Sequence, residues 1–224
     1  MEISQYIDHT LLKADATAVQ IKTLCSEAIQ NNFKTVCINS HYIPFAHKLL
    51  KDSQVGICTV VGFPLGASPK EVKALEASMA ITNGAKEIDM VINISALKDE
   101  LYSIVENDIK LLVETCHSKR AKLKVIIETC LLTDEEKIMA CELAARAGAD
   151  YVKTSTGFST SGATENDIKL MRKAVGPDIG VKASGGIRDR ATADIMINAG
   201  ATRLGTSSGI LIVKDEVNRT DSSY

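Results

Sequence analysis

The chain has 224 residues, of which 45% are hydrophobic and 24% charged, and its formal net charge is -2. This length suits one compact domain, and a barrel of eight strand–helix units needs about 200 residues or more. The slightly acidic balance argues against a basic surface for nucleic acid or membrane lipid, and no apolar run is long enough to span a bilayer.

The strand candidates are short runs rich in β-branched residues. In chain order they cover residues 6–10, 35–39, 56–61, 87–93, 123–128, 149–154, 179–183 and 202–206. Most are apolar throughout, as expected for parallel strands that are covered by helices.

Helical patterns separate these strands, and each is expected to bury one apolar face. The expected faces are Ile21, Leu24, Cys25, Ala28 and Ile29, then Val72, Leu75 and Met79, then Ile168, Met171 and Val175. Thr17 and Thr133 are candidate start signals, and Gly84, Gly148 and Gly200 are candidate stop signals. Strict alternation of strands and helices implies a parallel sheet, and eight strand–helix units favour closure of that sheet into a barrel. We therefore predict a single (β/α)8 TIM barrel over residues 1–213, followed by a polar C-terminal tail over residues 214–224.

The six cysteines form no Cys-x-x-Cys pair, and most lie in apolar stretches. This pattern favours reduced, buried thiols over a disulfide framework, and the four histidines show no zinc-ligand spacing. No secretory signal is visible at the N-terminus, so a reducing cytoplasm is the expected location. For Cys37, a buried and unreactive thiol is the preferred interpretation.

Three charged residues interrupt apolar strands where packing does not explain them. They are Asp89 in the 87–93 run, Lys153 in the 149–154 run and Lys182 in the 179–183 run. A single strand lysine could extend outward between helices. Two lysines at like positions on adjacent strands, with an aspartate nearby, instead favour a site at the carboxyl ends of the strands.

The chemistry that such a lysine pair favours is Schiff-base formation. An amine nucleophile must be unprotonated, whereas a free lysine has a pKa of roughly 10.4. Burial and a second ammonium group both disfavour the charged form, and a depression of about three units corresponds to roughly 4 kcal/mol. One lysine would attack a carbonyl, the other would stay cationic, and the carboxylate would move protons. This chemistry needs neither a metal nor a redox cofactor, so no cofactor is expected.

Glycine and hydroxyl residues cluster after the late strands. The segments are 154–157, 184–186 and 205–209. Tight turns would account for each segment alone. After the seventh and eighth strands of a barrel, however, such loops commonly bind phosphate through backbone amides.

The strings at 151–158 (Tyr-Val-Lys-Thr-Ser-Thr-Gly-Phe), 181–188 (Val-Lys-Ala-Ser-Gly-Gly-Ile-Arg) and 87–93 (Glu-Ile-Asp-Met-Val-Ile-Asn) resemble the deoxyribose-phosphate aldolase family. The strings at 7–12, 35–39, 61–66 and 124–129 are similar to the same family, so the resemblance covers nearly the whole chain. It implies a lyase that reversibly cleaves 2-deoxy-D-ribose 5-phosphate to D-glyceraldehyde 3-phosphate and acetaldehyde, in deoxyribonucleotide catabolism.

The resemblance also implies roles for particular residues. Lys153 would form the Schiff base, Lys182 would favour its neutral form, and Asp89 would relay protons. The phosphate would be held by Gly157, Gly185, Gly186, Ser207 and Ser208, and Thr156 would face the sugar. Asp8 would pair with Lys182. The resemblance implies small-molecule sugar phosphates and aldehydes as partners, with no nucleic acid or membrane, and a homo-oligomer, either a dimer or a tetramer.

Several points stay open at this stage. The terminal Tyr224 either reaches the active site and helps to move a proton or belongs to a disordered tail. Asn39-Ser40-His41 departs from the proline that follows the asparagine in many relatives. The lysines between 119 and 124 are expected at an exposed turn and strand entry. The alternative functions are a Schiff-base aldolase for another phosphorylated aldol and a non-catalytic barrel that binds sugar phosphate.

Overall fold

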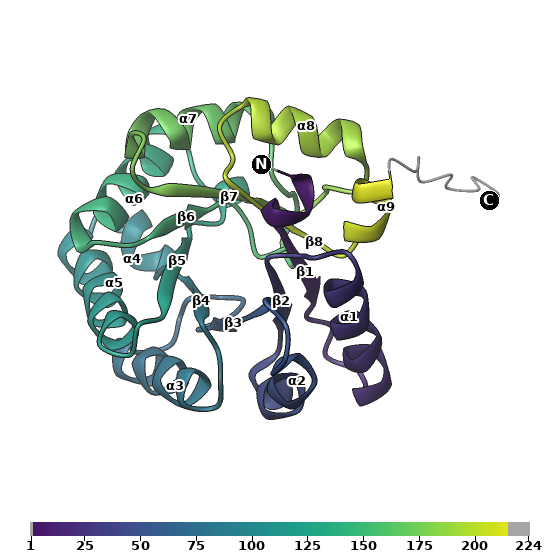
Figure 1. Ribbon diagram of the computed structural model, residues 1–224. Coiled ribbons are helices and arrows are strands. Elements are labelled where there is room, and N and C mark those ends of the chain that lie inside the picture. The colour runs from purple at the N-terminus through teal and green to yellow at the C-terminus, as the bar shows by residue number, and fades with distance from the viewer. Residues whose placement is uncertain (1, 215–224) are drawn as a thin grey trace.

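A computed structural model of the chain describes residues 2–214, and these form one closed barrel of parallel strands joined in sequence order (Figure 1). The predicted (β/α)8 barrel is therefore confirmed. The strands are β1 (Ile7–Leu11), β2 (Thr35–Ile38), β3 (Gly56–Val61), β4 (Glu87–Val91), β5 (Lys122–Ile126), β6 (Tyr151–Lys153), β7 (Gly180–Ser184) and β8 (Arg203–Thr206).

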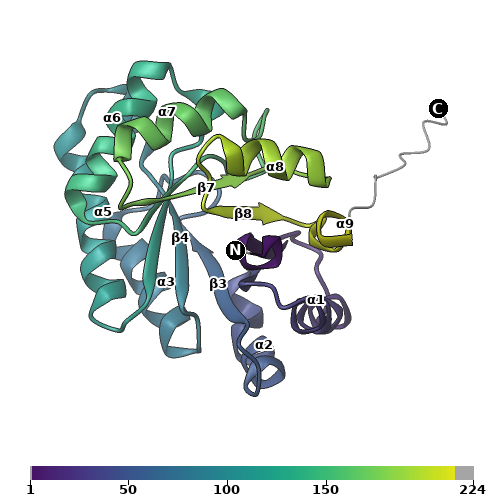
Figure 2. The same ribbon diagram turned by 45° about the horizontal axis from the view of Figure 1, so that its top comes forward.

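Helices surround the barrel on its outside, as Figures 1 and 2 show. The α-helices are α1 (Ala18–Gln30), α2 (Ile43–Leu50), α3 (Lys70–Thr82), α4 (Ile94–Lys98), α5 (Tyr102–His117), α6 (Asp134–Ala147), α7 (Glu165–Val175), α8 (Arg190–Asn198) and α9 (Gly209–Lys214). Short 3-10 helices are η1 (Ile3–Tyr6), η2 (Ser40–Tyr42) and η3 (Thr129–Leu131). Because the helices cover the outer face of the barrel, the strands are buried on both faces.

Local signals in the sequence set several helix ends. Thr17 and Thr133 each form a capping box. The threonine hydroxyl accepts a hydrogen bond from the backbone amide of the residue three positions later, and the side chain of that later residue accepts one from the threonine backbone amide. Helix α6 ends at Gly148, whose φ of 87° is the left-handed conformation that glycine adopts without strain. These caps confirm the predicted start and stop positions.

The expected apolar face of α3 is wrong. Val72, Leu75 and Met79 are 45%, 61% and 58% exposed, whereas Lys73 and Ala77 on the opposite face are fully buried. The lysine is tolerated there because its ammonium group donates to the Val91 carbonyl at 2.9 Å and lies 2.5 Å from the Asp108 carboxylate. The α3 stripe, defined here as Val72, Leu75 and Met79, therefore faces away from the barrel.

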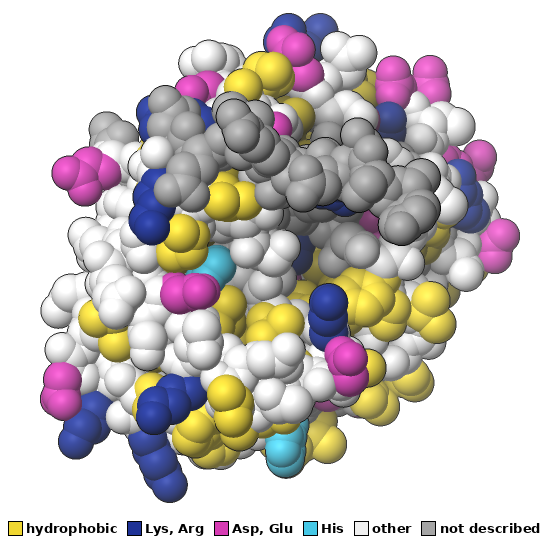
Figure 3. Space-filling model, turned by 90° about the vertical axis from the view of Figure 1, so that its right-hand side faces the viewer, with side chains coloured by type: hydrophobic (Ala, Val, Ile, Leu, Met, Phe, Trp, Pro, Cys, Tyr) yellow, Lys and Arg dark blue, Asp and Glu magenta, His cyan; other side chains and the backbone are white. Residues whose placement is uncertain are grey.

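The surface carries both signs of charge. Figure 3 shows basic and acidic side chains interspersed on one face of the molecule, with hydrophobic side chains scattered among them. Within residues 2–214, each helix is either too short or too polar to cross a lipid bilayer. The predicted polar tail, apart from Lys214, lies outside the described residues.

Candidate active site

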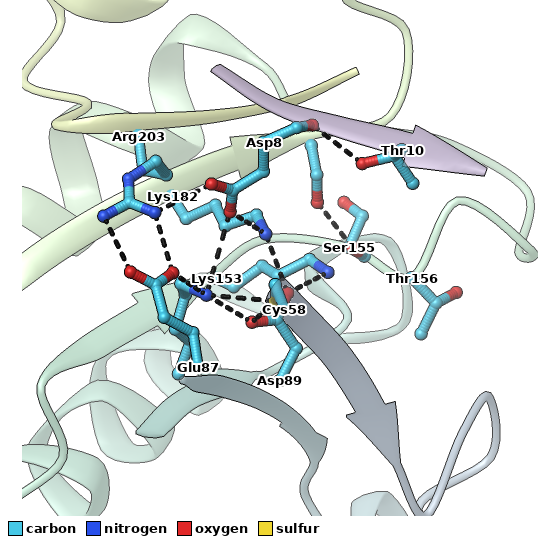
Figure 4. Close-up of polar contacts among 12 residues, drawn as sticks. Asp8, Thr10, Cys58, Glu87, Asp89, Lys153, Ser155, Thr156, Lys182 and Arg203 are labelled. Carbon is cyan, nitrogen blue, oxygen red and sulfur yellow. Dashed lines mark hydrogen bonds and ion pairs between the residues drawn. The ribbon is translucent and has the colours of Figure 1, made fainter. Parts of the chain in front are cut away.

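The three residues singled out by the sequence meet inside the barrel. Lys153 on β6 and Lys182 on β7 are register partners, so both side chains point to the same side of the sheet. The Nζ atoms of Lys153 and Lys182 each lie 2.8 Å from Oδ2 of Asp89, which comes from β4 (Figure 4). All three residues are 3% exposed or less. The structure thus brings the predicted lysine pair and aspartate into direct contact.

Asp8 joins this cluster from β1, which pairs with β8, the neighbour of β7. Its Oδ2 lies 2.5 Å from Nζ of Lys182, so the predicted pairing of these two residues is confirmed. Arg203 on β8 donates to Asp8 at 2.7 Å and to Glu87 at 2.7 Å. Figure 4 shows these side chains converging from several strands onto one point in the barrel. Sequence reasoning missed Glu87 and Arg203.

The prediction that Lys124 lies at an exposed strand entry is wrong. Lys124 is fully buried, and its Nζ lies 2.8 Å from Oδ1 of Asp89 and 2.6 Å from Oε2 of Glu87. Lys122, two residues earlier on the same strand, is exposed because it lies at the strand entry. A signal was present in the sequence, since Lys124 interrupts an apolar run just as Lys153 does.

Electrostatics fix the charge states of most of the cluster. Burial alone would raise the pKa values of Asp8 and Asp89, but the surrounding cations outweigh it and hold both well below their usual range. Burial alone would lower the pKa of Lys182 and of Lys124, yet the neighbouring carboxylates raise both above the ordinary lysine value. Asp8 and Asp89 are therefore carboxylates at neutral pH, and Lys124 and Lys182 are ammonium groups.

A metal ion would meet an unfavourable environment in this cluster. Within residues 2–214, two groups of side chains each bring three possible ligand atoms within 4.8 Å of one another, namely Cys37-Cys58-Asp89 and Asp8-Cys58-Glu87. Their carboxylates already accept hydrogen bonds from lysine and arginine side chains. The same positive charges would repel a divalent cation.

A cavity of about 440 Å³ opens above the cluster at the carboxyl ends of the strands. Lys153 is among its lining residues, as are five residues expected to contact substrate, namely Thr156, Gly157, Gly185, Gly186 and Ser207. Ser208 is not among the lining residues. Its amide donates to the Thr206 hydroxyl at 2.9 Å, and its carbonyl accepts from Ile212 in α9. Four of the five residues predicted to bind phosphate thus line the cavity, and the fifth, Ser208, follows the lining residue Ser207 in the chain.

Two glycines of this cavity adopt conformations that other residues avoid. Gly185 and Gly186 have φ values of 82° and 81°, in the left-handed region. A Cβ added to Gly185 would lie 2.8 Å from Cα of Gly162. The close packing of these two backbones therefore requires glycine at position 185.

Thr156 is held by a residue that the sequence analysis did not single out. Its hydroxyl donates to Oε2 of Glu128 at 2.5 Å, and Glu128 is only 2% exposed. Glu128 itself has a φ of 58°, an unusual conformation for a non-glycine residue. The turn after β5 thereby fixes the position of a residue expected to face the sugar.

Two features named in the sequence analysis remain, the Asn39-Ser40-His41 segment and Tyr224. In the Asn39-Ser40-His41 segment, the side-chain amide of Asn39 donates to the carbonyls of Leu12 and Lys13 at 3.3 Å, so it ties the loop after β1 to the loop after β2. Tyr224 lies outside the described residues.

Comparisons with known proteins match the whole chain. The model of the "DeoC/LacD family aldolase" matches residues 3–217. The deoxyribose-phosphate aldolase of Geobacillus sp. (strain WCH70) is 61% identical over 222 residues, which cover 99% of this chain and 98% of that protein. The protein of the same name from Carboxydothermus hydrogenoformans is 60% identical over 222 residues, and the alignment covers 98% of this chain and 97% of that protein.

Solved structures agree with these matches. The structure of the tetrameric deoxyribose phosphate aldolase from Aeropyrum pernix is 35% identical, with a TM-score of 0.89. The alignment covers 95% of this chain and 89% of that one.

Proposed function

The chain belongs to the DeoC/LacD family of aldolases, and from this premise we propose that it reversibly cleaves 2-deoxy-D-ribose 5-phosphate to D-glyceraldehyde 3-phosphate and acetaldehyde. It is a lyase that acts through a lysine Schiff base. The assignment of catalytic roles to Lys153, Asp89 and Lys182 rests on one observation. Lys153 lines the cavity at the barrel mouth while its amine contacts Asp89, which also accepts from Lys182.

Lys153 is the best candidate for the nucleophile among the buried lysines of residues 2–214. These are Lys73, Lys124, Lys153 and Lys182, and Lys153 is the one that lines the cavity. Lys124 and Lys182 are fully buried, are not among the lining residues of the cavity, and are held as ammonium groups by carboxylates. A substrate carbonyl entering the cavity would therefore meet the Lys153 amine first.

The charge balance of the cluster favours a neutral amine. The acidic members are Asp8, Glu87 and Asp89, and the basic members are Lys124, Lys153, Lys182 and Arg203. Three carboxylates face four cations if every group is charged. Loss of one proton balances the cluster, and a buried unbalanced charge is costly. Lys153 is the member of the cluster that lines the cavity, where a substrate carbonyl can reach its amine.

The reaction steps follow from these positions. The neutral Lys153 amine attacks the aldehyde carbon C1 of the open-chain sugar, and loss of water gives an iminium ion. Asp89 takes the proton of the C3 hydroxyl, the C2–C3 bond breaks, and its electron pair moves toward the iminium nitrogen to give an enamine. Glyceraldehyde 3-phosphate leaves, C2 is reprotonated, and water releases acetaldehyde and restores the amine.

The phosphate group would lie at the other end of the cavity. Gly157, Gly185, Gly186, Ser207 and Ser208 are the residues proposed to hold it. Glycine allows the backbone amides to approach an anion closely, and serine adds neutral hydrogen-bond donors. Thr156, fixed by Glu128, would contact the sugar between the phosphate and the amine.

Reductive trapping tests this proposal. Sodium borohydride added with acetaldehyde should attach one ethyl group to Lys153, located by peptide mapping. Lys153→Met should remove the adduct and the activity, whereas the exposed-site variant Lys169→Met on α7 should retain both. An adduct at another lysine, or none in folded protein, would count against Lys153.

Two other functions would give different results. A Schiff-base aldolase for another phosphorylated aldol would also be trapped at Lys153 but would prefer a different sugar in a substrate panel. A non-catalytic sugar-phosphate barrel would bind the sugar without turnover, and Lys153→Met would leave its cellular role intact.

We further propose that the chain forms homo-oligomers in the cytoplasm. The six cysteines are unpaired thiols, which suits a reducing compartment. The exposed α3 stripe is a candidate contact surface between copies, since apolar side chains gather on one face of the helix. Light scattering should show that Met79→Glu lowers the molar mass while the control Lys169→Glu does not, and an unchanged mass for Met79→Glu would exclude the stripe as the contact.

A further inference from the structure

Two cysteine thiols lie side by side inside the barrel. Cys37 on β2 and Cys58 on β3 are register partners, and they are 1% and 0% exposed. Their sulfur atoms and a carboxylate oxygen of Asp89 all lie within 4.8 Å of one another. Neighbouring strands run about 4.8 Å apart, which falls within the Cα separation that a disulfide requires. The backbone therefore permits a bond between these two sulfurs after side-chain rotation.

Cys58 connects this thiol pair to the candidate active site. Its Sγ lies 3.1 Å from Oδ1 of Asp89, to which it donates, and it accepts from Nζ of Lys124 at 3.2 Å. Figure 4 shows the Cys58 side chain among the charged groups of the cluster. Any change in the Cys58 sulfur therefore alters the hydrogen bonding of Asp89.

The two thiols differ in acidity. The neighbouring thiol of Cys58 lowers the pKa of Cys37 below its ordinary value, and the positive charge of Lys182 contributes despite burial. Burial raises the pKa of Cys58 well above that value, with Cys37 and Asp89 adding to the effect. Cys37 is thus the thiol that more readily becomes a nucleophilic thiolate, and Cys58 is placed to attack it in a second step.

We propose that Cys37 and Cys58 form an oxidisable dithiol site, which a peroxide converts to a disulfide and which thereby suppresses the aldolase reaction. In the first step the Cys37 thiolate attacks one peroxide oxygen. The S–O bond forms, the O–O bond breaks, and the leaving oxygen takes a proton to become water.

The second step closes the disulfide. The Cys58 sulfur attacks the Cys37 sulfenic acid, the S–S bond forms and the S–O bond breaks. The Cys58 proton leaves with the oxygen as a second water. Two thiols and one hydrogen peroxide thus give one disulfide and two waters, and the peroxide is the oxidant.

Hydrogen peroxide can approach from the cavity. Leu12 packs against Cys37 and Cys58 in one apolar cluster and also lines the cavity at the barrel mouth. Phe63, which packs against the same cluster, is only partly buried. A small neutral oxidant therefore has one layer of side chains to pass. The sequence favours an unreactive thiol for Cys37 considered alone, and that expectation does not apply to Cys37 paired with Cys58.

Disulfide formation would act on Asp89 directly. The oxidised Cys58 sulfur has no hydrogen left to donate, so Oδ1 of Asp89 loses one of its two donors. The sulfur must also move toward Cys37 and away from Lys124. The effect on activity rests on the proposed aldolase function, whereas the covalent bond itself does not.

The experiment treats the reduced, full-length protein with hydrogen peroxide and measures bond formation and activity separately. Peptide mapping without reductant should show the Cys37 peptide joined to the Cys58 peptide. Activity should fall by at least about tenfold, the factor expected for loss of one hydrogen bond to a charged group, and dithiothreitol should restore it. Each variant is compared with its own untreated activity.

Three variants separate this site from other cysteine chemistry. Cys37→Ala and Cys58→Ala should each resist the treatment, whereas Cys130→Ser, which removes the partly exposed thiol, should be as sensitive as the parent chain. Inactivation of Cys37→Ala or Cys58→Ala to the same degree would overturn the proposal, as would a disulfide that leaves activity intact. If an alanine variant does not fold, the peptide map of the parent chain decides the question, since absence of the Cys37–Cys58 link refutes it. A chain with no aldolase activity but with the link would refute the proposed function alone.

Discussion

The replacement Lys182→Met tests whether the second buried ammonium group keeps the proposed nucleophile neutral. The Nζ atoms of Lys153 and Lys182 both lie 2.8 Å from the same oxygen of Asp89, so at most twice that distance separates them. Two unit charges roughly 5 Å apart repel by about 3 kcal/mol at an effective dielectric constant of about 20. That energy corresponds to roughly two orders of magnitude in an equilibrium or rate constant.

We therefore expect Lys182→Met to lower kcat/KM about 100-fold near pH 7 and to move the acid limb of its pH profile to higher pH. The sign follows because removal of a positive neighbour favours the protonated amine, which then needs a higher pH to lose its proton. Both carboxylates keep a cationic partner, since Arg203 contacts Asp8 and Lys124 contacts Asp89.

The assay is kcat/KM measured across pH on variants whose fold is checked by circular dichroism. Lys182→Arg is the matched control because it retains a cation, so its acid limb should stay near that of the parent chain. A uniform loss of activity at every pH, with an unmoved acid limb, would refute this reasoning. Such a result would show that Lys182 acts by shape or hydrogen bonding rather than by charge.

Three further predictions follow from the same cluster. Lys124→Met should cost about 3–5 kcal/mol in the free energy of unfolding, because it removes a fully buried cation and takes one ion-pair partner from each of two buried carboxylates, Glu87 and Asp89. Lys122→Met at the exposed strand entry should change that free energy by about 0.5 kcal/mol or less, and equal effects in urea titrations would contradict this. Gly205→Ala would place a Cβ 3.0 Å from Cε of Lys182 and should cost about 1–3 kcal/mol and lower kcat, which steady-state kinetics would check. The pKa of Asp8 is held below its ordinary value of 3.8, so its contribution to stability is complete above about pH 4 and declines as the pH falls below that. Asp8→Asn should therefore flatten the dependence of stability on pH below about pH 4, and a slope in that range equal to that of the parent chain would count against it.

The cluster also shows how one set of charges can serve folding and reactivity. Asp8, Lys182 and Arg203 link β1 to β7 and β8 across nearly the whole length of the sequence, and their burial makes each ion pair depend on the others. Loss of a single partner would leave a buried charge without compensation, which is costly. A barrel closed by such pairs keeps its amines and carboxylates in fixed relative positions, as catalysis requires.

The sequence by itself determined the fold class and the main chemical groups. Alternation of apolar strands with helical patterns predicted the closed barrel, because each pattern reflects a local preference of the backbone and a face that must be buried. Asp89, Lys153 and Lys182 were recognisable because each places a charge within an apolar strand. The caps at Thr17 and Thr133 were recognisable for the same reason, since they act over a few residues.

Only the tertiary structure decided which charges meet and which faces are buried. Lys124 and Lys122 lie on one strand, yet the register of β5 against β4 brings Lys124 to Asp89 and leaves Lys122 exposed. The α3 stripe has helical spacing, but spacing does not tell which face turns inward, and the Lys73–Asp108 pair settles it in favour of the opposite face. Both outcomes depend on contacts between residues far apart in the chain, and periodicity within one segment carries no information about them.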